Sequence, residues 1–241
     1  MATEHAIPVD GDTIAAVHHA ADTDRWLIFC HGFLSDKTGS YEARAERAVA
    51  EGYNAVRFDF RGSGDSDGAF IDATLTSRIE DLVGVIDRFD PPSYALFGSS
   101  FGGLVAFHAT AGQAGVDPVA VVARSPVTYT RAFDPYRRTV ETEGTLRYDD
   151  DRAIDARFFE DFDTYGFGEV AESLSIPVMI AHGGDDDAVP IADSFDAAAA
   201  LDTDVALLKY ADEGHRFSAA AEERLRDRAF DWLDDAVGTD A

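Results

Sequence analysis

The sequence predicts an α/β fold in which a mostly parallel sheet is covered by helices on both faces. Three observations support this prediction. Short apolar runs alternate with helical segments along most of the 241 residues, a strand pair with a tight turn opens the chain, and a glycine-rich turn joins one apolar run directly to a helix. Such alternation is typical of strand–helix–strand units, whose strands are buried on both faces. The length suits one domain, residues 1–241.

The chain is expected to open with a β-hairpin. Residues 7–9 and 13–17 are the candidate strands, and Asp10-Gly11 between them is a hairpin turn signal. The strands expected after the hairpin are residues 26–30, 55–58, 94–97, 119–123, 178–181 and 205–210. The expected helices are residues 41–51, 75–89, 104–109, 192–201 and 219–237.

Residues 127–173 interrupt this alternation. A long, poorly periodic insertion at the edge where parallel strands end is typical of a cap or lid, so we expect one here. Its aromatic side chains are candidates for lining a substrate pocket, and plain cap packing is the alternative. The suspected pocket residues are Phe133, Tyr136, Phe158, Phe159 and Phe162. The insertion also contains six arginines, which are expected mainly to pair with its own acidic residues. The alternative is that one of them binds a carboxylate of the substrate.

A candidate nucleophile lies in the turn between strand 94–97 and helix 104–109. Residues 98–102 read Gly-Ser-Ser-Phe-Gly. Glycine two residues before and two residues after Ser100 removes the Cβ clash of a very tight turn, and lets the hydroxyl project from strained backbone. Ser99 fails this test, because phenylalanines occupy the corresponding positions around it.

A serine hydroxyl is a poor nucleophile near neutral pH and needs an adjacent base. His215 follows strand 205–210, and it is the only one of the seven histidines that lies beyond the acidic run 185–187. That acidic run follows strand 178–181. Ligands bind beyond the carboxyl ends of the strands in open parallel sheets, so the base and an acid are expected on the same edge as Ser100.

Four motifs occur in order along the chain. They are His31-Gly32-Phe33, the run FDFRGSGDSDG at residues 58–68, the turn at residues 98–102, and GGDDDAVP at residues 183–190. In this combination the chain resembles the α/β-hydrolase superfamily, and within it the serine aminopeptidase (S33-type) and feruloyl-esterase-like branch. The resemblance implies the α/β-hydrolase fold with the cap insertion described above.

The resemblance also implies roles for single residues. Aligning the last motif with G-x-x-D-x-x-V-P selects Asp186 as the acid, with Asp185 as the alternative, and the superfamily order of serine, acid and histidine makes His215 the base. The backbone N–H groups of Phe33 and Phe101 are expected to form the oxyanion hole. His31 precedes the nucleophile, so a structural role is favoured for it.

The implied activity is that of a serine hydrolase that cleaves carboxylic esters through an acyl-enzyme on Ser100. An aminopeptidase or amidase is the first alternative, and a perhydrolase or C–C bond hydrolase on the same scaffold is the second. A non-catalytic binding module is disfavoured, because nucleophile, acid and base are all retained in order. No cofactor is required, and a small acyl compound is the expected substrate.

Two ligand sites are disfavoured by residue spacing. A calcium loop needs alternating Asp or Asn ligands and a distant Glu, which the run 185–187 lacks, so no metal is expected. The glycines at residues 62–68 are spaced G-x-G-x-x-x-G rather than G-x-G-x-x-G. Asp65 and Asp67 would also repel a pyrophosphate, so this segment is expected to be a structural loop beside the active site.

The composition is strongly acidic, with 46 Asp and Glu against 20 Lys and Arg and a net charge of −26. This balance disfavours nucleic acids and anionic membranes as partners. So many acidic side chains repel one another, and salt relieves this repulsion. The composition therefore predicts a salt-adapted protein from the cytoplasm of a high-salt organism.

Cys30 is the only cysteine and cannot form an intrachain disulfide. The N-terminus lacks the features of a signal peptide. The sequence leaves both a monomer and a homodimer open.

Overall fold

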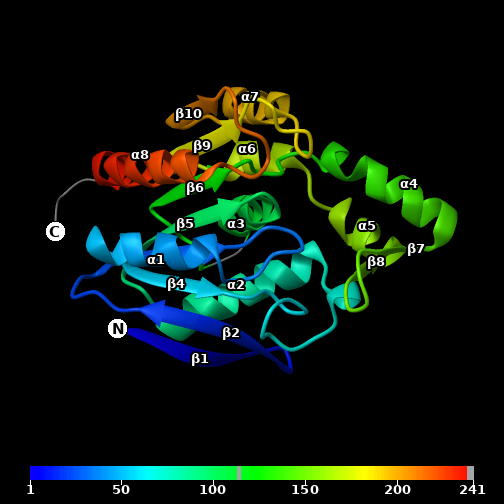
Figure 1. Cartoon of the computed structure of the whole chain (residues 1–241), viewed down its shortest axis with the longest axis horizontal. Helices are drawn as coiled ribbons and strands as arrows, with labels where there is room; N and C mark the ends of the chain where they lie inside the picture. The colour runs from blue at the N-terminus through cyan, green and yellow to red at the C-terminus, as the bar shows by residue number, and fades with distance from the viewer. Residues whose placement is uncertain (113–114, 238–241) are drawn as a thin grey trace.

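The computed structural model describes residues 1–112 and 115–237, and Figure 1 shows their arrangement. Within these residues an eight-stranded sheet has the order β1-β2-β4-β3-β5-β6-β9-β10. Its strands are β1 (Ala2–Val9), β2 (Asp12–His19), β3 (Arg25–Cys30), β4 (Asn54–Phe58), β5 (Ser93–Ser99), β6 (Ala120–Arg124), β9 (Val178–Gly183) and β10 (Val205–Tyr210). All neighbours from β4 to β10 are parallel, so the predicted α/β class with a mostly parallel sheet is confirmed.

The antiparallel part of the sheet is the predicted hairpin. Strands β1 and β2 pair from Ala2 with His19 to Val9 with Asp12, and β2 then pairs antiparallel with β4. Asp10 and Gly11 form the connecting turn with φ of 49° and 95°. Positive φ at both turn residues matches the right-handed twist of the two strands, which is why Asp-Gly is favoured there.

Helices cover both faces of the sheet. They are α1 (Ser40–Ala50), α2 (Leu75–Phe89), α3 (Phe101–Gly112), α4 (Asp134–Glu143), α5 (Ala156–Phe162), α6 (Phe167–Ser173), α7 (Ile191–Ala200) and α8 (Ala219–Val237), with short 3-10 turns η1 (Phe70–Asp72) and η2 (Thr130–Phe133). Helices α1 and α8 pack together on one face, and α2, α3, α6 and α7 on the other. Each face buries its own apolar core, because the strands between them carry apolar side chains on both sides.

Residues 127–173 contain more regular structure than the sequence analysis expected. The strands β7 (Thr145–Arg147) and β8 (Ala153–Asp155) pair antiparallel between α4 and α5. Figure 1 shows α4, β7, β8 and α5 beyond the end of the sheet toward which the parallel strands point, whereas α6 returns to pack on α3 and α7. Four arginines of the insertion pair with acids: Arg131 with Asp193 and Asp196, Arg137 with Asp163, Arg152 with Asp149, and Arg157 with Asp72 and Asp155.

The loop at residues 62–68 is organised by one buried carboxylate. Asp59 is fully buried and accepts hydrogen bonds from the backbone N–H of Lys37 (2.6 Å) and of Asp65 (2.8 Å). The Lys37 ammonium lies 2.5 Å from both the Asp59 and the Asp65 carboxylates. Gly64 has φ of 53°, and a Cβ there would collide with the Asp59 carboxylate. The glycine-rich loop therefore folds around an ion pair inside the protein.

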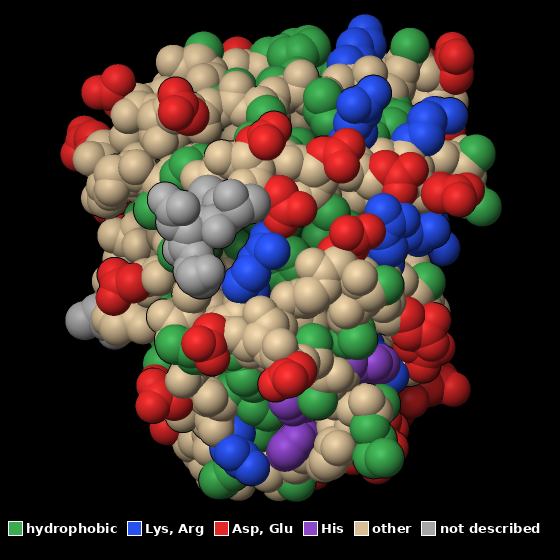
Figure 2. Space-filling model, turned by 90° about the vertical axis from the view of Figure 1, so that its left-hand side faces the viewer, with side chains coloured by type: hydrophobic (Ala, Val, Ile, Leu, Met, Phe, Trp, Pro, Cys, Tyr) green, Lys and Arg blue, Asp and Glu red, His purple; other side chains and the backbone are tan. Residues whose placement is uncertain are grey.

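On the face shown in Figure 2, acidic side chains are spread over the surface rather than collected in one patch. Figure 2 shows one face of the molecule, where Asp and Glu are scattered among fewer Lys and Arg. Much of the net charge of −26 is thus exposed to solvent and to salt. In the part of the chain that is described, no helix combines the length and the apolar character needed to cross a membrane.

Lys37→Met is expected to lower the free energy of unfolding by about 3 kcal/mol, because it leaves the buried Asp59 charge without its cation. Urea unfolding at fixed salt measures the change. Lys209, the only other lysine, is exposed on β10 and supplies the matched control. Lys209→Met should change stability by less than about 0.5 kcal/mol. Equal losses in the two variants would contradict the assignment of a buried ion pair.

Candidate active site

Ser100 occupies the sharp turn between β5 and α3 and has φ of 54°. A left-handed backbone at a non-glycine residue is strained and is common at functional sites. A Cβ on Gly98 would lie 2.5 Å from the carbonyl oxygen of Gly102, and a Cβ on Gly102 would collide with the carbonyl oxygen of Cys30. Only glycine fits at both positions, which is the reason that the sequence analysis gave for choosing Ser100 over Ser99.

His215 lies on the loop between β10 and α8, and its imidazole reaches the turn at Ser100. The His215 Nε2 atom is 3.0 Å from the Ser100 hydroxyl oxygen, and Nδ1 is 2.8 Å from Asp186 Oδ2. The Nδ1–H donates to the carboxylate, so Nε2 is left to accept the serine O–H. The structure therefore brings the three residues selected from the sequence into one hydrogen-bonded chain.

Asp186 is held from several sides. Its side chain is fully buried, and Oδ1 accepts the backbone N–H groups of Ala188 and Val189, both at 2.9 Å. Burial by itself would raise its pKa, but hydrogen bonds from His182, His215 and Val189 N–H outweigh burial and hold the pKa well below its usual range. Asp186 is therefore ionised at neutral pH.

The neighbouring aspartates have different positions. Asp185 and Asp187 are exposed, and the Asp185 backbone N–H donates to the carbonyl of Glu213 at 2.9 Å. Neither carboxylate forms a hydrogen bond with His215 within the described chain. Of the three consecutive aspartates, the geometry thus unites Asp186 with the histidine.

His182 is a site residue that the sequence analysis did not single out. It is fully buried at the end of β9, and its Nε2 lies 3.1 Å from Asp186 Oδ2 and 3.0 Å from the carbonyl oxygen of Val189. Its Nδ1 accepts the hydroxyl of Ser194 at 2.7 Å. Nε2 therefore carries the proton, and His182 is a second donor that fixes the carboxylate. In the sequence, the only indication of this role was the position of His182 immediately before Gly183-Gly184.

The loop after β3 lies directly against Ser100. A Cβ on Gly32 would be 3.3 Å from the Ser100 Cβ atom, so Phe33 follows at the edge of the turn. The rings of Phe33 and Phe101 pack with their centroids 5.6 Å apart. The two residues proposed as oxyanion donors therefore have their side chains in contact, and both lie next to residues of the turn at Ser100.

His31 supports this loop from inside. It is buried, its Nε2 accepts the Phe60 backbone N–H at 3.0 Å, and its Nδ1 donates to the Gly32 carbonyl at 2.9 Å. Burial lowers the pKa of His31 to about 4, so the ring is neutral at pH 7. Both ring nitrogens are occupied by backbone groups, in agreement with the structural role favoured from the sequence.

The suspected pocket residues of the insertion pack on one another and on Phe33, in the loop after β3. Phe133, Phe158, Phe159 and Phe162 are buried, whereas Tyr136 is exposed. The Phe33 ring contacts Phe133 and Phe158, with centroid distances of 5.4 and 5.6 Å. These rings form a continuous aromatic cluster beside Ser100, and their role in lining a substrate pocket stays a prediction.

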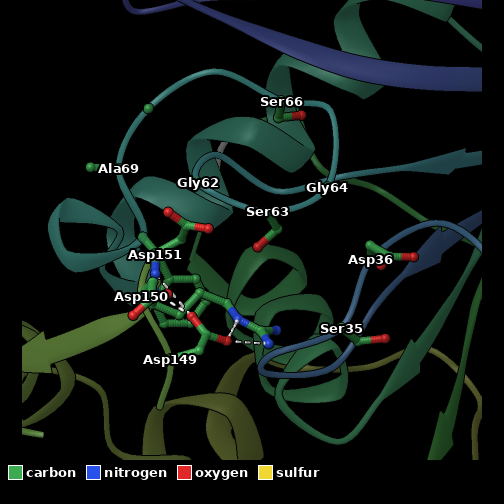
Figure 3. A pocket seen from close by; sticks show the side chains of 13 residues that line it. Ser35, Asp36, Gly62, Ser63, Gly64, Ser66, Ala69, Asp149, Asp150 and Asp151 are labelled. Atoms are coloured by element: carbon green, nitrogen blue, oxygen red, sulfur yellow. Dashed lines mark hydrogen bonds and ion pairs between the residues drawn. The ribbon is translucent and has the colours of Figure 1, made fainter. Parts of the chain in front are cut away.

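The open space next to the hydrogen-bonded chain is polar. A cavity of about 480 Å³ contains Ser100 and His215 and is also lined by Asp36, Thr38, Tyr41, Arg124 and Glu222. A larger hollow of about 790 Å³ lies between the loop at residues 62–68 and residues 149–152 of the insertion, and shares Ser35 and Asp36 with the first. Figure 3 shows that Asp149, Asp150 and Asp151 face Gly62, Ser63 and Gly64 across it.

Among the residues that are described, no group of three or more His, Cys, Asp or Glu side chains is arranged to hold a metal ion.

Comparison with protein families finds one match over most of the chain. The model of the prolyl oligopeptidase family matches residues 40–240. Among curated proteins, the mitochondrial palmitoyl-protein thioesterase ABHD10 of Homo sapiens is 27% identical over 228 residues, which cover 88% of this chain and 74% of that protein. The lysophosphatidylserine lipase ABHD12 of Danio rerio is 29% identical over 174 residues, covering 68% of this chain and 44% of the lipase.

Solved structures share the fold over nearly the whole chain. Est1E from Butyrivibrio proteoclasticus with ferulic acid bound superposes with a TM-score of 0.85 at 21% identity, covering 97% of this chain and 99% of Est1E. The mouse alpha/beta hydrolase domain-containing protein 10 gives the same values. A putative hydrolase from Agrobacterium vitis S4 is 27% identical with a TM-score of 0.81, covering 95% of this chain and 99% of that structure.

Asp186→Asn is expected to lower kcat by about 10³- to 10⁴-fold, because the amide no longer holds His215 in the tautomer that accepts the serine proton. Initial rates with p-nitrophenyl acetate measure the change, and circular dichroism checks that the variant is folded. Asp185→Asn is the matched control and should stay within about twofold of wild type. A larger loss in Asp185→Asn than in Asp186→Asn would reverse the assignment of the acid.

Proposed function

Because the chain belongs to the prolyl oligopeptidase family of α/β hydrolases, we propose that it is a serine hydrolase that cleaves carboxylic esters through an acyl-enzyme on Ser100. The observation that carries the proposal is the hydrogen-bonded chain from Asp186 through His215 to Ser100 at the carboxyl edge of the parallel sheet. Each of the three is supplied by a different loop after a strand, as substrate sites in open α/β sheets are.

The chemistry follows from this geometry. His215 Nε2 takes the Ser100 proton while the serine oxygen attacks the acyl carbon, and the ionised Asp186 stabilises the imidazolium. The tetrahedral intermediate collapses when the imidazolium gives its proton to the leaving alcohol, which leaves an ester on Ser100. Water, deprotonated by the same histidine, then attacks this ester and releases the acid and the free serine.

The developing oxyanion needs donors that are already in position. We assign this role to the backbone N–H groups of Phe33 and Phe101. The close contact of Gly32 with Ser100 supports the first donor, and the position of Phe101 at the N-terminus of α3 supports the second. A helix N-terminus also favours negative charge, which adds to the effect of the hydrogen bond.

The cavity favours a small acyl group. Its lining is more polar than apolar, and the insertion rings Phe133 and Phe158 are already packed against Phe33, which lines the cavity. A long acyl chain would have to displace these packed rings. Short-chain esters therefore lead, and thioesters belong beside them because curated relatives are palmitoyl-protein thioesterases and the same acyl carbon is attacked.

An aminopeptidase or amidase is the second candidate, and Asp36 is the observation in its favour. Its carboxylate lines the Ser100 cavity and accepts hydrogen bonds from Thr38, whose hydroxyl is 2.5 Å away. These hydrogen bonds keep the pKa of Asp36 below its usual value, so the group is charged at neutral pH. A carboxylate at that position suits the ammonium group of an amino-terminal substrate. A perhydrolase or C–C bond hydrolase has no such residue in its favour.

Labelling with a fluorophosphonate probe tests the serine hydrolase assignment. Wild-type protein should be labelled in molar KCl, and Ser100→Ala should not, because the probe reacts only with an activated serine. Ser100→Ala should also lower esterase kcat by more than about 10³-fold. A panel of p-nitrophenyl esters, a thioester and aminoacyl-p-nitroanilides then ranks the substrate classes. An unlabelled wild-type protein would remove the basis of the proposal.

We further propose that the protein is adapted to the cytoplasm of a high-salt organism, on the basis of its net charge of −26. Molar salt shortens the Debye length to about 3 Å and relieves repulsion between surface carboxylates. The melting temperature should therefore rise from dilute buffer to molar KCl. A melting temperature that stays flat or falls over the salt series contradicts this proposal.

A further inference from the structure

Three charged side chains, those of Arg44, Arg124 and Glu222, form a cluster near Ser100 and His215. Glu222, in the first turn of α8, accepts two hydrogen bonds from Arg44 of α1, at 2.8 and 2.9 Å. Arg124, at the end of β6, places its Nε 3.6 Å from the same carboxylate. The side chains of Arg44, Arg124 and Glu222 are 2, 11 and 13% exposed. The cluster therefore joins α1 and α8, which lie on the same face of the sheet, to the end of β6, and Arg124 and Glu222 also line the Ser100 cavity.

Arg124 bonds to the backbone of both the nucleophile and the base. Its carbonyl oxygen accepts the Ser100 N–H at 2.9 Å, and its Nη1 donates to the His215 carbonyl at 2.6 Å. The guanidinium also lies over the ring of Phe217, 5.4 Å from its centroid. One residue thus spans the gap between the turn that carries the serine and the loop that carries the histidine.

The loop that carries His215 is hydrogen-bonded on both sides to the loops that carry its two partners. On the side of the acid, the Asp185 N–H donates to the Glu213 carbonyl at 2.9 Å. On the side of the nucleophile, Arg124 holds the His215 carbonyl itself. The imidazole must stay within hydrogen-bond reach of two partners that come from different strands, so the position of its backbone sets both distances.

The stability of the fold does not by itself explain this cluster. Buried ion clusters gain little net free energy, because desolvation offsets their attraction, and apolar replacements of similar volume are often neutral or stabilising. Two arginines here share one glutamate, which adds repulsion between like charges. Burial and the nearby Arg44 charge both lower the pKa of Arg124. A cluster that costs this much desolvation is better explained by the geometry that it imposes.

We propose that Arg124 is a positioning residue that fixes the separation of His215 Nε2 and Ser100 Oγ, and that Glu222 and Arg44 hold its guanidinium in place. This inference rests on the proposed serine hydrolase function. Ser99 takes part as an acceptor, because its hydroxyl lies 3.1 Å from Arg44 Nη1 and 3.4 Å from Arg124 Nε. The serine that the turn cannot present to a substrate is thus used to orient the two cations.

Arg124→Met tests the inference. Methionine keeps the apolar stem but removes the donor to the His215 carbonyl, so the imidazole loses its alignment with the serine. With p-nitrophenyl acetate, kcat should fall about 10- to 100-fold, because misplacement of a reacting group by about 1 Å has an effect of this size. KM should change by less than about threefold, and the rate of fluorophosphonate labelling should fall in parallel with kcat. Arg124→Lys should recover part of kcat, because an ammonium can still donate to the carbonyl.

Arg61→Met supplies the matched control. Arg61 has a similarly buried side chain, 13% exposed, and pairs with the buried Asp81 of α2, but it contacts neither Ser100 nor His215. Both variants should lose thermal stability, whereas only Arg124→Met should lose kcat. If the two variants lose stability equally and both keep wild-type kcat, Arg124 is merely structural and the inference is wrong.

Two further outcomes keep the inference separate from the proposed function. If Arg124→Met does not fold, Arg124→Lys and Glu222→Gln carry the test, and wild-type kcat in both would overturn the inference. If wild-type protein is labelled by the probe and loses labelling in Ser100→Ala, the function stands whatever the Arg124 variants do. Absence of labelling in wild-type protein would remove the function and with it the inference.

Discussion

The close approach of three backbone segments around Ser100 is the constraint on which the rest of the site depends. The first turn of α3 lies against the end of β5 and against the carbonyl group that ends β3, at separations that leave no room for a Cβ on Gly98 or Gly102. Ser100 within this contact has a positive φ of 54°, and its hydroxyl lies 3.0 Å from His215 Nε2. The loop that carries Gly32 and Phe33 follows β3 directly, so the same contact sets its distance from the serine. Strain at one residue is thus supported by packing at several others.

Much of the fold and of the candidate site could be predicted because the relevant signals are local. The bounds of α2 and β10 follow from periodic apolar residues and clear breaks, and Ser100 follows from glycines two positions away. The α/β-hydrolase superfamily, predicted from four short motifs, is confirmed by the family match. Arg124 could not be found in this way, and for His182 the only local signal was its position immediately before Gly183-Gly184. Their importance comes from partners 4 to 91 positions away, including Asp186 and the carbonyl of His215, and neither lies in a motif. The strands β7 and β8 are too short to show a period.

Charge is distributed differently inside and outside the protein. The excess of acids is on the surface, whereas two of the buried cations have buried or nearly buried acidic partners: Lys37 pairs with Asp59, and Arg44 pairs with Glu222. Arg78 is buried and forms no salt bridge within the described chain. Its guanidinium instead lies 5.2 to 5.8 Å from the ring centroids of Phe33, Phe70 and Phe101. Burial lowers the pKa of Arg78 to about 10, so it stays charged at pH 7 and contributes cation–π attraction. Dissolved ions therefore act on the outer carboxylates and leave these inner contacts nearly unscreened.

The aromatic cluster couples the insertion to the loop that follows β3. Phe33 belongs to that loop, yet its ring is packed among Phe133, Tyr148 and Phe158 of the insertion. A bulky acyl part that wedges these rings apart would also shift the main chain beside the reacting carbon. Under the proposed function, size selection and turnover are then properties of the same few rings, and natural variants that alter the insertion would change the speed of the reaction together with its choice of substrate.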